Sequence, residues 1–225
     1  MTDSPAPVVA AFDLDGTLTE GGSVFLWLRR LAGTGRAYRA ALRLLAPLTV
    51  GAVRSSQWAD HAKERLFHSL LVGRDLEQVT EVSRTFALEH LEHAGRARLI
   101  ERLEWHRSMG HDVVIVSASP QVYVGVVAEV LGAQGALGTR LAVDPRGRLT
   151  GSYLGKNCRG IEKLRRLSEW IDGRDYPFEP VTYAYGNSRG DYRMLAAATH
   201  PFNAGKLGRL GSLRRFPGVR SAVGS

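Results

Sequence analysis

Three short apolar runs that end in polar residues predict three buried strands. They cover residues 8–12, 112–116 and 182–185, and each is followed by acidic or small polar residues. Apolar positions at helical spacing follow the last two runs and predict a helix at residues 121–131 after the second. This alternation is typical of a doubly wound α/β fold with a parallel sheet, in which the functional site lies at the carboxyl ends of the strands.

The long segment between the first two strands predicts an inserted helical unit. Its apolar positions recur at helical spacing over residues 24–31, 38–45, 57–71 and 76–93, with a continuation toward residue 107. Alternation around a Pro-Arg-Gly turn further along predicts a β-hairpin at residues 139–154. We therefore expect an α/β core formed by residues 1–18 and 108–225, with a helical cap at residues 19–107.

Composition narrows the class of protein. The chain has 225 residues, of which 44% are apolar, and this suffices for one well-buried domain that carries a smaller insert. The formal charge of +8 would attract phosphorylated substrates and other anions. The basic residues are scattered, however, and no recognisable nucleic-acid-binding module accompanies them, so we do not expect a nucleic-acid role.

The start of the chain and its cysteine content favour a cytoplasmic protein. Residues 1–7 lack the basic start and the apolar run of a secretory signal. The single cysteine, Cys158, cannot form an internal disulfide, and we expect it to be a small packed side chain.

Two aspartates after the first strand carry the most specific chemical signal. In the sequence FDLDGTLT, Asp13 and Asp15 can point into one crevice, while Gly16 permits a tight turn. One carboxylate could attack phosphorus, and the other could protonate the leaving oxygen and later deprotonate water. Because two close anions repel each other and the substrate, we expect a divalent cation, and magnesium prefers such oxygen ligands.

This pattern resembles the haloacid dehalogenase superfamily of phosphatases, whose members carry D-x-D-x-T after the first strand. The resemblance spans nearly the whole chain and implies that Asp13 is the nucleophile. It implies that Asp15 is the general acid and base and a metal ligand through its backbone carbonyl, and that Thr17 helps to orient this second aspartate.

The resemblance also assigns the groups that bind phosphate. Ser117, after the second strand, matches the serine that holds a phosphate oxygen, with Ser119 as a nearby competitor. Lys163 matches the lysine that neutralises the nucleophile and the phosphate, with Arg159 one helical turn earlier as the alternative. The phosphate is then expected to be lined by Gly16, Ser117, Ala118 and Lys163.

The fourth motif departs from the family pattern. The family has an aspartate where this chain has Asn187, and Asp191 follows four residues later. An asparagine carbonyl can still ligate magnesium, but it brings no charge. The expected metal ligands are therefore Asp13, Asp15, Asn187 and Asp191, and the choice between the last two as the direct ligand stays open. A catalytically weak domain that only binds a phosphorylated ligand is an alternative.

The position of the insert resembles subfamily IB, which includes phosphoserine phosphatases and phosphatidylglycerophosphate phosphatases. Phosphoserine phosphatases have a substrate-binding glutamate where this chain has Gly22, and Glu20 is expected to face elsewhere. Residues 40–53 are mostly apolar and are flanked by arginines. A lipid phosphate, with peripheral contact to the inner face of an acidic membrane, is therefore one substrate hypothesis. Phosphoserine or another small metabolite is the other.

Further polar clusters are expected to be solvated helix faces rather than metal sites. They are Glu89, His90, Glu92 and His93 in one helix, and His61, Glu64 and His68 in another. The four tryptophans are expected in the core or at interfaces rather than on a base-stacking platform.

Overall fold

A five-stranded parallel sheet forms the centre of the computed structural model, which describes residues 6–45, 56–205 and 213–219. Its strand order is β3-β2-β1-β6-β7. The strands are β1 (Val8–Phe12), β2 (Asp112–Pro120), β3 (Gly135–Thr139), β6 (Val181–Gly186) and β7 (His200–Asn203). The parallel α/β fold is confirmed, and the three predicted strands are the three central ones. The chain leaves β1 on one side for β2 and returns on the other as β6, so the topological switch point lies at β1.

Helices cover both faces of the sheet, and each face has its own apolar cluster. Ala10 and Phe12 of β1 pack on α5 (Ala97–Ser108) and α6 (Gln121–Leu131). Val9 and Ala11 point the other way, toward α7 (Ile161–Asp172) and α8 (Tyr192–Ala197). Successive side chains of a strand alternate between faces, and a strand buried on both sides therefore shows an unbroken apolar run.

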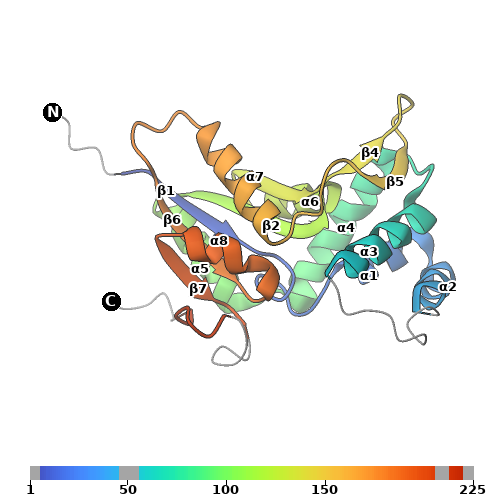
Figure 1. Cartoon of the computed structure of the whole chain (residues 1–225), viewed down its shortest axis with the longest axis horizontal. Helices are drawn as coiled ribbons and strands as arrows, with labels where there is room; N and C mark the ends of the chain where they lie inside the picture. Colours follow the sequence, from blue (N-terminus) through green and yellow to red (C-terminus); the bar gives the residue numbers. More distant parts are fainter. Residues whose placement is uncertain (1–5, 46–55, 206–212, 220–225) are drawn as a thin grey trace.

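The inserted helices lie at one end of the molecule, at the right of Figure 1, beside the β4–β5 hairpin. They are α1 (Val24–Ala32), α2 (Thr34–Leu45), α3 (Ser56–Leu71) and α4 (Leu76–Ala94). Helix α4 packs on α6, and the buried Trp27 of α1 donates from Nε1 to Ser83 Oγ of α4 at 2.8 Å. The predicted hairpin is present as β4 (Leu141–Val143) and β5 (Leu149–Tyr153), and α3 packs on β5.

The predicted continuation of the fourth helix toward residue 107 is present, but as a separate helix. Helix α4 ends at Ala94 and α5 begins at Ala97, where the chain turns to contact β1 and β2. Gly95 permits this break, because a Cβ atom there would lie 2.2 Å from the carbonyl oxygen of Leu91.

No helix among the described residues has the length and apolarity needed to cross a bilayer. The apolar stretch at residues 40–53 falls partly outside the described residues. Its first part forms the end of α2, where the Leu42 side chain is 63% exposed.

Candidate active site

The strand register brings the predicted site residues to one edge of the sheet. Phe12 of β1 lies opposite Ile115 of β2 and Tyr185 of β6. Asp13 follows β1 directly, and its backbone N–H donates to the carbonyl of Tyr185 at 2.9 Å. Because neighbouring parallel strands end at the same edge, the residues after these three strands converge around the Asp13 carboxylate.

A buried lysine joins two carboxylates at the centre of the site. Lys163 Nζ lies 2.6 Å from Asp13 Oδ1 and 2.6 Å from Asp191 Oδ1, and it also donates to the carbonyl of Val116 at 2.6 Å. Lys163, at the start of α7, is 2% exposed, so all three of its donors are used within the protein. The structure thus places Lys163, rather than Arg159, against Asp13.

The electrostatics of this cluster follow from its burial. Burial raises the pKa of the Asp13 carboxyl, the Asp191 carboxylate adds to the rise, and Lys163 opposes it. Burial acts to lower the pKa of Lys163, but the charges of Asp13 and Asp191 outweigh it and hold that pKa above its ordinary range. Lys163 therefore stays an ammonium, with a carboxyl group on each side.

Thr17 and Asp15 occupy the turn after β1. Thr17 Oγ1 donates to Asp13 Oδ2 at 2.8 Å. The resemblance implied that Thr17 orients the second aspartate, Asp15, but its hydroxyl contacts the first. Asp15 accepts from the Ser23 backbone N–H at 2.6 Å and from the Ser119 hydroxyl at 2.5 Å. Of the two serines considered for phosphate binding, Ser119 is therefore less available, because its hydroxyl already donates to Asp15.

Ser117 and Ala118 lie in β2, which extends four residues past the predicted strand end to Pro120. Ser117 is 1% exposed, and its hydroxyl accepts from the Ser119 N–H at 3.1 Å. Both Ser117 and Ala118 line the same cavity of about 180 Å³ as Asp13 and Asp15. The Ser117 hydroxyl thus has its proton free for a ligand oxygen in that cavity.

Asn187 has an unusual environment that bears on metal binding. Its Oδ1 atom is buried and receives no hydrogen bond, although buried polar atoms are nearly always paired. Its amide nitrogen lies against Gly16, where an added Cβ would sit 1.9 Å away. Gly16, at φ +83°, therefore serves both the turn and the close approach of Asn187.

Asp191 is saturated by the protein itself. Its Oδ2 accepts from the N–H groups of Asn187 at 3.2 Å and Ser188 at 2.9 Å and from the Ser188 hydroxyl at 2.8 Å. Its Oδ1 accepts from Lys163. Asp191 thus holds the loop after β6 and the lysine, whereas Asn187 Oδ1 accepts no hydrogen bond.

These residues fit a divalent cation. Asp13 and Asp191 contact the ammonium of Lys163, and the cavity is lined by one more carboxyl group than basic groups. The unpaired carbonyl of Asn187 adds a neutral oxygen ligand. In the part of the chain that the structure describes, no three His, Cys, Asp or Glu side chains form a group that could hold a metal, so a cation here would need other oxygen ligands, such as the Asn187 carbonyl.

The same cavity is also lined by Asp60 and Lys63 of α3 and by Asn157 of the loop before α7, none of which was predicted. Arg159, which was considered as a rival of Lys163, lines it too. Lys63 Nζ donates to the Ala118 carbonyl at 2.6 Å, and Asn157 Nδ2 donates to Asp60 Oδ1 at 2.6 Å. Burial lowers the pKa of Lys63 to about 8, against the opposing charges of Asp15 and Asp60. The sequence did not mark Asp60 and Lys63 as cavity residues, because their spacing in α3 is that of any polar helix face.

Arg96 is another residue that sequence reasoning missed. Its Nη1 donates to the carbonyls of Gly16 and Ala204, each at 2.7 Å. It thereby ties the turn that carries Asp15 to the segment after β7, and so positions the loop of Asp13 and Asp15.

The solvated-face interpretation is wrong for His90. The His90 ring is 7% exposed and stacks on Phe86 with centroids 5.3 Å apart. In the other set, Glu64 Oε1 accepts from the Tyr153 N–H at 2.9 Å, while His61 and His68 are exposed. Trp27 lies in the core as predicted, Cys158 is buried, and Glu20 is exposed as expected. The Trp58 side chain lies outside the described residues.

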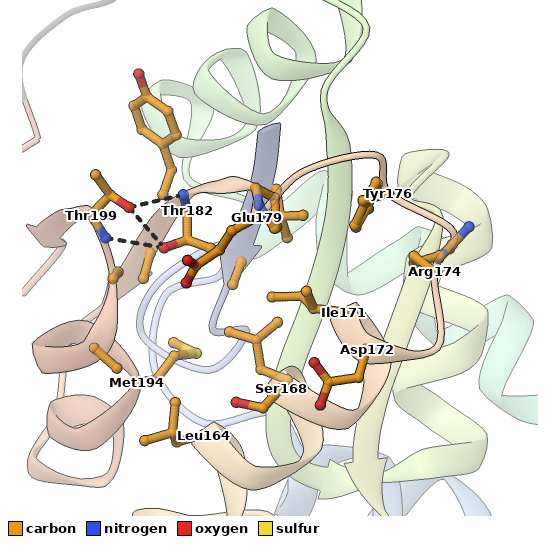
Figure 2. A pocket seen from close by; sticks show the side chains of 18 of the residues that line it. Leu164, Ser168, Ile171, Asp172, Arg174, Tyr176, Glu179, Thr182, Met194 and Thr199 are labelled. Atoms are coloured by element: carbon orange, nitrogen blue, oxygen red, sulfur yellow. Dashed lines mark hydrogen bonds between the residues drawn. The ribbon is translucent and has the colours of Figure 1, made fainter. Parts of the chain in front are cut away.

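A larger cavity of about 500 Å³ lies elsewhere, between α7, α8 and the sheet. Figure 2 shows apolar and polar side chains in its wall, with Met194 and Leu164 on one side and Asp172, Arg174 and Tyr176 on the other. None of the residues around Asp13 lines it, so it takes no part in the chemistry considered above.

Comparisons with known proteins agree with this geometry. Residues 10–196 match the family model described as haloacid dehalogenase-like hydrolase. Protein CicA of Caulobacter vibrioides is 34% identical over 85% of this chain and 83% of its own length. A probable phosphatase of Mycobacterium tuberculosis is 29% identical over 87% of this chain and 68% of its own.

Solved structures share the fold. A protein of unknown function from Bordetella pertussis Tohama I superposes with a TM-score of 0.73 at 22% identity, covering 91% of this chain and 93% of that one. A substrate-bound phosphoserine phosphatase superposes with a TM-score of 0.59 at 20% identity, covering 89% and 87%. At these identities the likeness concerns the fold alone.

Proposed function

The chain belongs to the haloacid dehalogenase-like hydrolases and is a phosphatase, and we propose that it hydrolyses phosphomonoesters through a phosphorylated Asp13 with the help of magnesium. The observation that carries this proposal is the buried Asp13 carboxylate, held between Lys163 and Thr17 at the switch point of the sheet, with Asp15 in the same cavity. This is a nucleophile with a proton donor beside it.

In the first step an oxygen of Asp13 attacks phosphorus, and the bond from phosphorus to the leaving oxygen breaks. Asp15, which carries a proton in the enzyme–substrate complex, gives it to that oxygen, so the leaving group departs as an alcohol. In the second step Asp15 takes a proton from water, whose oxygen attacks the phosphorus of the aspartyl phosphate. The bond to Asp13 breaks, phosphate is released, and both aspartates return to their starting states.

The remaining residues bind and orient. The Ser117 hydroxyl and the Ala118 N–H hold phosphate oxygens, and Lys163 offsets the charge gathered around Asp13. Magnesium, when bound by Asp13, Asp15 and Asn187, would offset the charge of the phosphate and align it with the nucleophile. Asp191 keeps Lys163 and the Asn187 loop in place.

The cap assignment supports a place in subfamily IB, with phosphoserine and phosphatidylglycerophosphate phosphatases. We propose that α1 to α4 form the cap and that α3 closes the cavity through the contacts of Lys63 and Asp60. Closure of this kind excludes water and selects the leaving group. Because the cavity is lined by Asp60, Lys63, Asn157 and Arg159, it favours a small polar leaving group over an apolar one.

A lipid phosphate is a second candidate substrate, supported by one feature of the cap. A groove between α2 and α3 is lined by Arg36, Arg39, Arg43 and Arg65, and residues 21–59 contain no acidic residue to neutralise them. Such a surface would attract acidic headgroups. Sedimentation with acidic liposomes tests it, and a protein that stays in the supernatant at low salt argues against membrane contact.

The test of the proposed function is Asp13→Asn. The amide has nearly the shape of the carboxylate but is a very poor nucleophile, so turnover of an aryl phosphate should fall on the order of a thousandfold or more. Wild-type protein should also lose activity in EDTA and regain it with magnesium. A variant with native circular dichroism and activity within a few-fold of wild type would remove the mechanism, and binding without turnover in the wild type would indicate a phospho-ligand-binding domain.

A further inference from the structure

Three buried polar side chains close to Asp15 each have an atom without a hydrogen-bond partner. These atoms are Ser23 Oγ, His90 Nε2 and the Tyr123 hydroxyl. Ser23 and Tyr123 are 0% exposed, and His90 is 7% exposed. Buried polar atoms form hydrogen bonds in the great majority of cases. Three unpaired atoms close together therefore indicate a site where a bound molecule supplies the missing hydrogen bonds.

The three side chains come from separate elements and converge beside Asp15. Ser23 precedes α1, and its backbone N–H donates to Asp15 Oδ1 at 2.6 Å. His90 of α4 and Tyr123 of α6 both pack on the Phe86 ring, with centroids 5.3 Å and 5.5 Å away. The Ser23 and Tyr123 hydroxyls interact electrostatically without the geometry of a hydrogen bond.

The environment also fixes the charge of these groups. Burial lowers the pKa of His90, and Asp15 opposes this in part. Burial raises the pKa of Tyr123, an effect that the Ser23 hydroxyl opposes and the charge of Asp15 reinforces. Near neutral pH the cluster therefore consists of two hydroxyls and a neutral imidazole, all within the field of the Asp15 carboxylate.

Resting on the proposed function, we infer that Ser23, His90 and Tyr123 form a subsite that receives the leaving group, and that this group carries a hydroxyl or an amine. Asp15 must reach the leaving oxygen to protonate it, so polar groups beside Asp15 lie where the leaving group extends. An alkyl chain there would leave all three polar atoms unpaired. A carboxylate there would be repelled by Asp15 once Asp15 has given up its proton. A hydroxyl or an amine satisfies both conditions.

The experiment compares matched pairs of phosphate esters. Phosphoethanolamine and propyl phosphate differ by an amine in place of a methyl group, and hydroxypropyl phosphate and butyl phosphate differ by a hydroxyl. The wild-type enzyme should favour the polar member of at least one pair in kcat/KM on the order of tenfold to hundredfold, because a polar site rejects an analogue that cannot pair with it. Tyr123→Phe and Ser23→Ala should reduce this preference to within a few-fold, mainly by lowering kcat/KM for the polar ester.

Tyr176→Phe is the matched control, because it removes a tyrosine hydroxyl bonded to Asp112 at the other end of β2. It should leave the preference unchanged. Turnover of all four esters without a polar preference, or an equal loss on both members of a pair in Tyr123→Phe and Ser23→Ala, overturns the subsite and leaves the proposed function standing. Absence of turnover on every ester and on an aryl phosphate overturns both.

Discussion

Acid should unfold this protein through a buried histidine that has no room for a second proton. His106 of α5 is 0% exposed, and its two ring nitrogens lie 2.8 Å from His111 Nδ1 and 2.8 Å from the Tyr185 hydroxyl. Burial lowers the pKa of His106 from 6.5 to about 3, and His111 and Arg102 add to the fall. The ring is also enclosed by Phe12 and Trp105.

The sign and size of the effect follow from linkage. Above the unfolded pKa of 6.5 the ring is neutral in both states, so it contributes no pH dependence. As the pH falls below that value, the unfolded chain takes up a proton that the folded chain refuses, and stability is lost until the folded pKa is reached. At about pH 5 this loss is about 2 kcal/mol, from about 1.4 kcal/mol for each pH unit below the unfolded pKa.

The assay is urea unfolding followed by circular dichroism across this pH range. His106→Gln keeps a hydrogen-bond donor and acceptor but cannot titrate, so its unfolding free energy should fall less steeply with acid, by about 1.4 kcal/mol for each pH unit. The exposed His61→Gln is the control and should keep the wild-type slope. Equal slopes for wild type and His106→Gln would refute the account of a neutral, enclosed imidazole.

Two further predictions concern the site. Asn187→Asp should tighten magnesium binding, and Gly16→Ala should weaken it by displacing the Asn187 side chain. The readout is the magnesium concentration that gives half-maximal activity, and an unchanged value in both variants would mean that residue 187 does not face the metal. Lys63→Met should raise KM about tenfold for a polar ester, the loss of one charge-assisted contact, whereas Lys156→Met, which removes an exposed lysine, should not.

The strands and helices that bury many apolar side chains could be predicted from the sequence. The strands β3 and β7 could not, because their sequences contain few large apolar residues. In β3, a Cβ on Gly135 would lie 2.8 Å from Trp170, and one on Gly138 would lie 2.7 Å from the Gln121 backbone. These glycines are required by packing, but they dilute the apolar pattern that predicts a strand. Strand β7, with the sequence HPFN, lies at the sheet edge, where proline is tolerated and the apolar signal is weak.

The site also contains residues that could be predicted from the sequence and residues that could not. Asp13 and Asp15 follow β1 and Asp191 follows β6, so the parallel register brings them to one edge, and Lys163 reaches them from the start of α7. Asp60, Lys63 and His90 come from inserted helices whose packing no local pattern specifies. His90 shows the difficulty most plainly, because its polar neighbours Glu89 and Glu92 are partly or fully exposed while its own ring is enclosed.

The asparagine in the fourth motif is consistent with the charge around it. The cavity is lined by four carboxyl groups, of Asp13, Asp15, Asp60 and Asp191, and by three basic groups, of Lys63, Arg159 and Lys163, so it already holds an excess of one formal negative charge. An aspartate at position 187 would add a further buried negative charge, which is costly in the absence of metal. Asn187→Asp should therefore bind magnesium more tightly and yet unfold more easily in EDTA than wild type. A variant that gains affinity without losing stability in EDTA would show that the charge at position 187 is not buried with these carboxyl groups.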